Sequence, residues 1–482
     1  MKTLLARLAS LALTAAIAGA APSLTIYNQD FAVVRDTVPL DLKPGVNALT
    51  YPGATAQVEP DSVILRDPAG VHSLQILEQN YRNDPVSQEL LLSLYEGKTL
   101  NFAREYSVNN STMTKLIPGR VVRSGYVPGG GTEQPIIEVD GQLQFSLPGE
   151  PRFPSLGDDT VLHPSFNWLL QSDVPGKFDA EIGYVTGGFS WSASYNLVAP
   201  ETGDSVDLIG WITLKNESGK TFTDARIKVL AGEVNKIEPV FRRARATYGG
   251  AVPPMSAMAA EPAVTEKAFD EYHLYSIARP TTLRDRETKQ VEFVSATGVH
   301  APVIYQYDGA DQGFRFYGNL NWDQDFGTQG GKKVAILREF VNAETNHLGI
   351  PLPAGKLRFY RRDDDGQLEF TGENTIDHTP RNETIHLTTG NAFDLVGERK
   401  QTDFHVDTTA KWLDESFAIT LRNRKKTPVT IRVVEHLYRW SNWTVTAKSD
   451  DFQKTDAQTI QFELPVAPDQ ERKVTYTVHY TW

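Results

Sequence analysis

The sequence contains no cysteine, and this absence excludes several kinds of site. Without thiols the chain has no disulfides, no thiolate metal ligands and no cysteine nucleophile. It also cannot carry the lipidated cysteine of a bacterial lipoprotein. A chain of 482 residues without disulfides has to be stabilised by hydrophobic cores, and at roughly 100–200 residues per domain we expect about two to four of them.

Long apolar runs are also scarce. After the N-terminal segment, no stretch has the roughly 20 apolar residues that a membrane-spanning helix needs. The N-terminal segment has Lys2 and Arg7, an apolar run over 8–17 and an Ala-Gly-Ala motif at 18–20. This pattern is typical of a secretory signal peptide with an A-x-A cleavage site, and the run is short for a membrane anchor. We therefore expect the protein to be exported.

Basic residues are outnumbered by acidic ones. The formal net charge is −12, and cleavage of a signal peptide that carries two basic residues would take it to −14. Phosphate backbones and anionic lipids would repel such a protein. We therefore expect no nucleic acid among its partners.

Strand patterns dominate what is present. Apolar and polar residues alternate along 23–53, with turns at Pro-Gly pairs, and the same period of two recurs up to the C-terminus. The best helix candidate is 85–97, where leucines recur at helical spacing and Gly97 ends the pattern. One strand face is expected to hold Phe189, Trp191, Ala193 and Tyr195. The expected fold is all-β, with several antiparallel β-sandwich or barrel-like modules and one short helix.

Composition and turn signals divide the chain into seven segments. In order, we expect a signal peptide (1–21), an N-terminal β domain (22–82), a short helix with a small β-barrel-like insert (83–160), the first part of a central β-sandwich (161–241), a flexible loop rich in Ala, Pro and Gly (242–266), the second part of the central sandwich (267–400) and a C-terminal Ig-like β-sandwich (401–482).

Two segments resemble each other. ITLKNESGKT at 212–221 and ITLRNRKKTP at 419–428 share a strand, a basic residue, an asparagine and a polar turn. Two related sandwich modules would explain this match. Convergent hairpin chemistry is the alternative, since Asn216 and Asn423 stand where chains turn.

Known catalytic spacings are missing. The nearest approach to a nucleophile elbow is Gly188-Phe189-Ser190-Trp191-Ser192, which lacks the second glycine and lies inside a strand pattern. No HExxH motif occurs, and the ten histidines are scattered. We expect no catalytic residue of a recognised class and no cofactor.

Three consecutive aspartates precede a glycine at 363–366. A calcium-binding EF-hand loop needs alternating carboxylates and a glutamate at position twelve, where this chain has Asn374. Asp-Gly is preferred where a hairpin turn requires positive φ. We therefore predict a hairpin turn, with an adventitious surface cation on Asp363, Asp364 and Asp365 as the alternative.

Polar and aromatic residues near predicted strand ends are the remaining candidates for a binding site. Tryptophans beside basic residues can stack on sugars or hold a peptide, although the interior of a sandwich also accounts for them. The candidates are Asp377, His378, Glu398, Arg399, Asp403, Glu435, His436, Trp440 and Trp443.

Several separated blocks resemble a bacterial family. They are WSASYNLVAP, LIGWITLKNESGKTFTDARIKVLAGE, PLPAGKLRFYRRDDDGQLEFTGENTIDHTP, FDLVGERKQTDF and ITLRNRKKTPVTIRVVEHLY. Over roughly 165–482 the chain resembles bacterial proteins with domain of unknown function 4139, relatives of the mucoidy-inhibitor A group. The resemblance implies an all-β exported or envelope protein and brings no established enzyme chemistry. Those relatives have a long coiled-coil insertion where this chain has only the segment 85–97 and a β insert.

We therefore expect an exported β protein in the periplasm or cell envelope of a diderm bacterium. It would act as a binding or structural module for an envelope protein or polysaccharide. The alternative is a hydrolase that acts on envelope polysaccharide or peptide through carboxylates on strand ends. Paired carboxylates roughly 5–9.5 Å apart in a cleft would favour a glycosidase.

Overall fold

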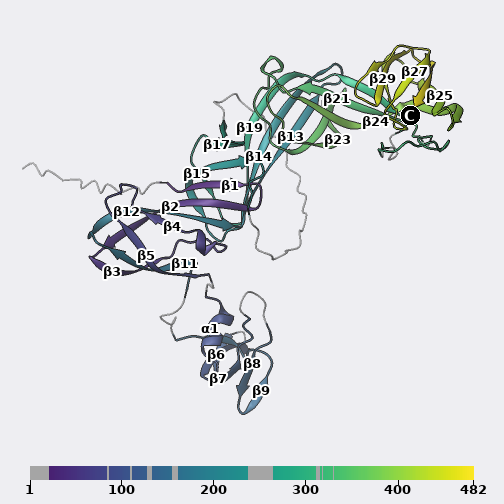
Figure 1. Cartoon of the computed structure of the whole chain (residues 1–482). Helices are drawn as coiled ribbons and strands as arrows, with labels where there is room; N and C mark the ends of the chain where they lie inside the picture. Colours follow the sequence, from purple (N-terminus) through teal and green to yellow (C-terminus); the bar gives the residue numbers. More distant parts are fainter. Residues whose placement is uncertain are drawn as a thin grey trace, which may run out of the picture. The chain divides into compact units, whose positions relative to one another are not determined.

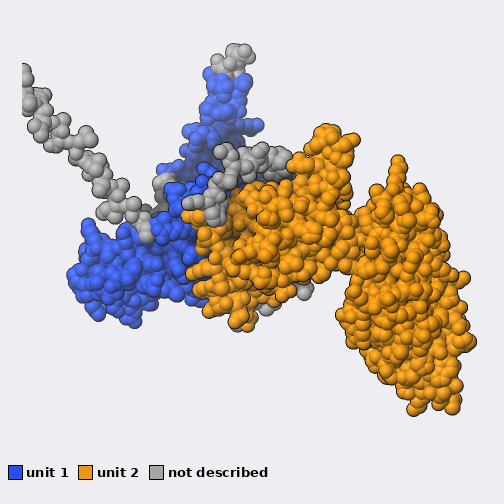
Figure 2. All heavy atoms as spheres, turned by 90° about the horizontal axis from the view of Figure 1, so that it is seen from above, with its two compact units in different colours: residues 1–190, 215–229, 279–289 blue, residues 191–214, 230–278, 290–482 orange. Residues whose placement is uncertain are grey.

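The computed structural model describes residues 21–83, 86–108, 111–127, 133–154, 161–236, 264–310, 315–316, 318–328 and 330–482. Residues 1–20 of the predicted signal peptide (1–21) and most of the predicted 242–266 loop lie outside these residues. Strands make up most of the described chain (Figure 1), so the all-β expectation is confirmed. The chain divides into two compact units, unit 1 (1–190, 215–229 and 279–289) and unit 2 (191–214, 230–278 and 290–482), which Figure 2 colours blue and orange.

Unit 1 begins with sheets in which every second side chain is buried, as in SLTIY at 23–27. Its larger sheet has the order β15-β1-β2-β12-β4, with β18 beside β15, and its smaller sheet has the order β3-β11-β5. The bounds are β1 (Ser23–Tyr27), β2 (Phe31–Leu42), β3 (Gly45–Tyr51), β4 (Ile64–Arg66), β5 (Leu74–Arg82), β11 (Ser165–Ser172), β12 (Gly176–Gly187), β15 (Phe222–Ala231), β18 (Thr281–Leu283) and the 3-10 turn η1 (Pro60–Ser62).

The predicted helix and β insert follow. Helix α1 (Gln88–Leu94) is capped by Ser87, whose side chain accepts a hydrogen bond from the amide of Leu90. A five-stranded sheet, β10-β6-β7-β8-β9, packs a small core with the helix residue Leu92. No helix in the described part of the chain has the length and apolar character to cross a membrane. The strands are β6 (Thr99–Val108), β7 (Ser111–Arg123), β8 (Ile136–Val139), β9 (Gln142–Gln144) and β10 (Glu150–Arg152).

Unit 2 contains a sheet of order β19-β14-β13-β22-β23, in which β13 and β22 run parallel, and an antiparallel hairpin of β16 and β17. The predicted strand face is confirmed, because all four of its residues from Phe189 to Tyr195 are buried on β13. The bounds are β13 (Phe189–Ala199), β14 (Ser205–Asn216), β16 (Val264–Phe269), β17 (Tyr272–Ile277), β19 (Glu287–His300), β22 (Gly355–Arg362) and β23 (Leu368–Ile376).

The acidic stretch forms the turn of an antiparallel hairpin between β22 and β23. Gly366 has φ = 80°, and its amide donates to the carbonyl of Asp363 at 3.0 Å. Positive φ is the conformation for which glycine is preferred in such a turn. The predicted Asp-Gly turn is therefore confirmed.

The C-terminal part of unit 2 is one nine-stranded sheet of order β27-β30-β25-β24-β21-β20-β26-β29-β28, called the C-terminal sheet below. Strands from both halves of this order, including β25, β30, β26 and β29, bury side chains in one core, so the sheet curls around it. The bounds are β20 (Val303–Asp308), β21 (Lys333–Val341), η2 (Glu344–Asn346), β24 (Thr384–Asp407), β25 (Trp412–Asn423), β26 (Val429–His436), β27 (Trp443–Lys448), β28 (Gln453–Lys454), β29 (Thr459–Val466) and β30 (Glu471–Thr481).

Asn216 and Asn423, the asparagines of the two similar segments, are fully buried and make the same set of hydrogen bonds. Each side-chain amide donates to the carbonyl four residues later and to two consecutive distant carbonyls. Each side-chain oxygen accepts from the amide two residues later. The acceptor carbonyls are those of Lys220, Leu283 and Arg284 for Asn216, and of Thr427, Val466 and Ala467 for Asn423.

Strand pairing around these asparagines is also the same. β14 pairs with β19 and β15 with β18 in the first set. In the second set β25 pairs with β30 and β26 with β29. Shared pairing and shared side-chain bonds favour two related modules over convergent turns.

Candidate functional site in the C-terminal sheet

Arg399 and Glu435, two of the candidates from the sequence, form a buried ion pair. The Arg399 Nε lies 2.8 Å from a Glu435 oxygen, and the two side chains are 2% and 0% exposed. The guanidinium lies 3.6 Å from the ring centre of Phe417, and the Tyr476 hydroxyl donates to the same carboxylate. Because a buried charge needs a partner and hydrogen bonds, this arrangement satisfies both ions internally.

A second buried ion pair repeats the same residue types. The Nε of Arg439 lies 2.7 Å from Glu415, and the Tyr480 hydroxyl donates to the other Glu415 oxygen at 3.1 Å. The two side chains of the pair are 1% and 6% exposed. The core of the C-terminal sheet therefore holds two Arg-Glu-Tyr clusters.

Electrostatics keep Tyr476 and Tyr480 protonated and keep Arg399 charged. Burial raises the pKa of Tyr476 and of Tyr480, and the neighbouring carboxylates raise both pKa values further. Burial alone would lower the pKa of Arg399, but the Glu435 carboxylate raises it above its ordinary value. Neither tyrosine is placed to give up its proton near neutral pH, which favours a structural role.

Both arginines also hold the chain segment 318–328, called the clamped loop below. Arg439 donates to the carbonyls of Asn321 (3.3 Å), Asp323 (2.6 Å), Gln324 (3.2 Å) and Phe326 (3.0 Å). With its bond to Glu415, these bonds use every N–H donor of the guanidinium. Arg399 adds a bond of 2.6 Å to the carbonyl of Gly327.

Four consecutive side chains of the clamped loop are exposed, while carbonyls of the loop face the buried arginines and the Phe326 ring lies 5.6 Å from the Arg439 guanidinium. Trp322 is 57% exposed, and Asp323, Gln324 and Asp325 are exposed as well. Local turns fix the backbone, since Asn321 accepts from the amide of Asp323, which in turn accepts from the amide of Asp325. Trp322 is therefore exposed on a backbone segment that hydrogen bonds from the buried arginines hold in place.

Another exposed aromatic comes from an irregularity in β24. Asn391 pairs with Ala335, but the next pair joins Val396 to Lys333, so β24 has extra residues between them. Phe393 lies among these residues and is 97% exposed. Bulges of this kind often redirect a side chain.

Two further candidates have partners on the same sheet. His436 Nε2 lies 2.9 Å from Asp308, and the carboxylate raises the pKa of His436 although burial opposes this. Glu398 pairs with Arg422 at 2.8 Å, and this contact lowers the pKa of the carboxyl. Glu398, Arg399, Glu435 and His436 lie on neighbouring parts of one sheet, but each is bound to a different partner.

The other candidates on the C-terminal sheet lie apart from the buried clusters. Asp403 is exposed and lies 3.2 Å from His405. Trp440 and Trp443 pack against the core, and the Trp443 indole donates to the carbonyl of Ala457 at 2.9 Å. Packing in the interior of a sandwich was the alternative to a binding role for these tryptophans, and the structure has this packing.

Asp377 and His378 follow the β22–β23 hairpin and are exposed. The Nδ1 of His378 accepts from the amide of Ala354 at 3.2 Å, and partial burial lowers the pKa of this histidine. Within the residues that the structure describes, no group of three or more His, Asp or Glu side chains is arranged to hold a metal ion. The cation alternative at 363–365 therefore has no further ligand to support it.

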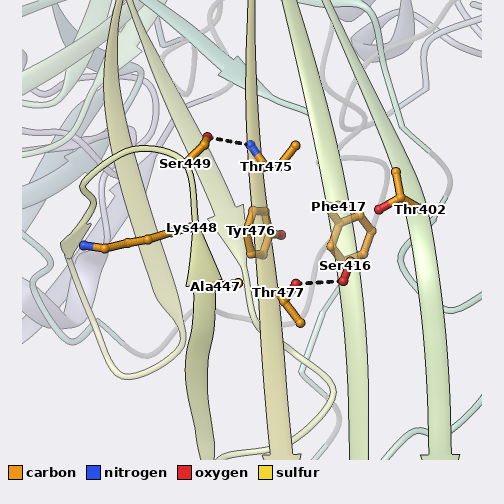
Figure 3. A pocket seen from close by; sticks show the side chains of 9 residues that line it. All are labelled: Thr402, Ser416, Phe417, Ala447, Lys448, Ser449, Thr475, Tyr476 and Thr477. Carbon is orange, nitrogen blue, oxygen red and sulfur yellow. Dashed lines mark hydrogen bonds between the residues drawn. The ribbon is translucent and has the colours of Figure 1, made fainter.

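The two best-formed hollows in the described surface are shallow and carry few charges. One lies on β24, β25, β30 and β27, and its lining includes Thr402, Ser416 and Thr477 (Figure 3). The other lies on β3, β11 and β5 and has Glu78 as its one carboxylate. Neither hollow holds the pair of carboxylates that a glycosidase needs.

One known protein family matches the part of the chain that contains the C-terminal sheet. The sequence model of the domain of unknown function DUF4139 matches residues 180–482, more than half of the chain. The chain belongs to the DUF4139 family. Within the DUF4139 region lie both buried clusters, the clamped loop and the hollow of Figure 3. A comparison with curated proteins gives no match.

Sequence reasoning did not find the main features of this DUF4139 site. It singled out Arg399 and Glu435 but missed Arg439, Glu415 and Trp322. Arg439 stands between Tyr438 and Trp440, and an arginine between two large aromatic residues was the available signal. Nothing in the local pattern of the clamped loop marks it as ordered.

Proposed function

We propose that this DUF4139 protein is an exported cell-envelope β protein that acts as a binding or structural module. One observation carries this proposal: the clamped loop, which two buried arginines fix by five bonds to main-chain carbonyls while Trp322 stays exposed. Binding residues are often found on loops that a rigid scaffold positions. Tryptophan is also prominent among the residues that dominate binding energy at interfaces.

Export is supported by the N-terminal segment. Its basic start, its short apolar run and its Ala-Gly-Ala motif are the three parts of a secretory signal peptide. The absence of cysteine from the sequence fits either redox environment, and the acidic net charge suits a soluble envelope protein. The periplasm of a diderm bacterium is the location we propose.

A binding role fits the geometry better than hydrolysis. Arg399, Glu435, Arg439 and Glu415, the most buried charges of the C-terminal sheet, are bound to each other and to the clamped loop. These four residues therefore support the structure of the sheet and the loop. No pair of carboxylates lines either hollow of the described surface. We therefore place the function in the outward side chains of the loop.

The test is affinity capture from the envelope of cells that express the full chain. Trp322→Ala is the test variant, and Phe370→Ala is its matched control because Phe370 is 56% exposed in the same unit. We expect the protein in the periplasmic fraction, and we expect Trp322→Ala alone to reduce the captured partner at least about tenfold. Retention in the cytoplasm, or equal capture by both variants, would contradict the proposal.

A further inference from the structure

The hollow of Figure 3 lies on the outer face of the C-terminal sheet, outside the clamped loop. Four adjacent strands contribute to it, and its volume is about 270 Å³. Phe417 and Tyr476 also belong to its lining, but their rings are buried in the core, where they stack at 5.6 Å. Its rim is lined by Thr402, Ser416, Ala447, Lys448, Ser449, Thr475 and Thr477.

A β-bulge lies on each side of this hollow, next to the same pair of residues. Ser416 and Thr477 are direct cross-strand partners on β25 and β30. On one side β24 shifts register between Gln401 and Asp403, where Asp403 meets Ser416. On the other side β27 shifts between Val445 and Ala447, where Ala447 meets Thr477. Each bulge bends its strand beside the same pair, and bulges are over-represented next to functional sites.

Hydroxyl groups dominate the chemistry of the rim. Ser416 and Thr477 share a hydrogen bond of 2.8 Å, and Ser449 accepts from the amide of Thr475 at 2.9 Å (Figure 3). The Ser449 hydroxyl already donates to Asp450 at 2.7 Å. A hydroxyl donates one hydrogen bond and accepts two, so Ser416 and Thr477 together keep one donor and further acceptor capacity for a ligand. The ligand that matches such a surface is itself rich in hydroxyls.

Lys448, the charged residue of the lining, is not placed to bind an anion in the hollow. Lys448 extends away from Ser416 and Thr477 in Figure 3, and its Nζ lies 2.6 Å from Asp451. Phosphate recognition relies on arginine, lysine or free backbone amides that face the ligand. Apart from Phe417 and Tyr476, whose rings are buried in the core, the lining has no large apolar side chain, which argues against a lipid tail.

An aromatic and a carboxylate continue the same strand face. Asp414 lies two residues before Ser416, and its cross-strand partner His479 lies 2.6 Å from it. Trp412, two residues further along, stacks on His479 with ring centres 6.0 Å apart. Side chains at i, i+2 and i+4 of a strand share one face. The hydroxyl hollow, the carboxylate and the stacked rings therefore form one row.

We propose that this row binds a neutral glycan chain, with sugar hydroxyls in the Ser/Thr hollow and a sugar ring against Trp412. The inference rests on the proposed function, since it gives the binding module a ligand class. It assigns a second surface that is separate from the clamped loop. Sugars offer hydroxyls that both donate and accept, together with apolar C–H faces, and the row presents complements to both.

The experiment is calorimetric titration of the full mature chain with two soluble probes, chitohexaose and cellohexaose. We expect at least one probe to bind with a dissociation constant near or below about 1 mM. Thr477→Tyr should fill the hollow and weaken binding at least about tenfold. Ser416→Ala, a smaller change that preserves the strand, should weaken it about threefold. Thr430→Tyr, an exposed strand position paired with Pro465, is the control and should bind as the natural chain does.

Failure of both probes to bind, or unchanged binding by Thr477→Tyr and Ser416→Ala, would overturn the inference. If Thr477→Tyr fails to fold, Ser416→Ala decides alone. Trp322→Ala separates this inference from the proposed function, because it should leave glycan binding unchanged while it reduces envelope capture. Loss of glycan binding in Trp322→Ala would contradict the assignment of two separate surfaces.

Discussion

Replacement of Arg439 is the perturbation that should reveal most about the C-terminal sheet. Arg439→Met leaves Glu415 buried without its cation and leaves four carbonyls of the clamped loop without a donor. Removal of one partner of a buried ion pair typically costs about 3–5 kcal/mol. The loop carbonyls can turn to water once the loop opens, so we add nothing for them and expect about 4 kcal/mol.

Hydrogen exchange read by mass spectrometry on the full chain measures this cost locally. At about 1.4 kcal/mol per factor of ten, amides of β25 and β30 should exchange roughly a thousandfold faster. Arg432→Ala is the control, because Arg432 and its two partners Glu339 and Glu463 are all partly exposed, so the two ion pairs together should be worth about 2 kcal/mol or less.

A double variant tests the cause of the loss. Arg439→Met with Glu415→Leu removes the unpaired charge and should recover about 2 kcal/mol, although Tyr480 still loses its acceptor. The reasoning would be refuted if Arg439→Met cost no more than the Arg432→Ala control. It would also be refuted if the double variant were less stable than the single one.

Three other predictions concern stability. Asn423→Ala and Asn216→Ala should each cost about 2–4 kcal/mol in denaturant unfolding, because each removes the side-chain bonds to three carbonyls and from one amide; clearly unequal costs would argue against related modules. His436 has a folded-state pKa above its unfolded value of about 6.5, so its pairing with Asp308 stabilises fully below that pH and is lost as pH rises through the folded pKa. The destabilisation by His436→Gln should therefore shrink as pH rises above about 6.5, and an effect that grows with pH would be wrong in sign. Gly397→Ala should cost at least about 2 kcal/mol in thermal unfolding, since a Cβ there would lie 2.2 Å from an aromatic ring of β20; an unchanged melting temperature would contradict this.

Local patterns in the sequence were enough to predict most of the elements. Alternation predicted the buried face of β13, leucine spacing predicted α1, and Asp-Gly predicted the turn at Gly366. These features depend on residues that are close in the chain, where backbone geometry dictates the pattern. The predicted domain boundaries and the export of the chain stay predictions.

The candidate site could be predicted only in part. Arg399 and Glu435 were singled out as dense polar groups, but their pairing joins residues 36 positions apart and depends on strand order. Arg439 was missed because it lies in a turn after β26 and its partner Glu415 stands 24 positions earlier in the chain. The two β-bulges beside Ser416 and Thr477 are shifts in the register between paired strands. The sequence of one strand does not reveal its register against another strand, so these bulges could not be predicted.

In-cell photo-crosslinking from the clamped loop tests the central claim most directly. A photo-reactive amino acid would replace Gln324, which is exposed and contributes its carbonyl to the Arg439 clamp. The account predicts a crosslinked envelope component that is lost when Trp322→Ala is added and is absent when the same photo-reactive residue stands at Phe370. Crosslinks that are equal at both positions, or that persist without Trp322, would contradict it.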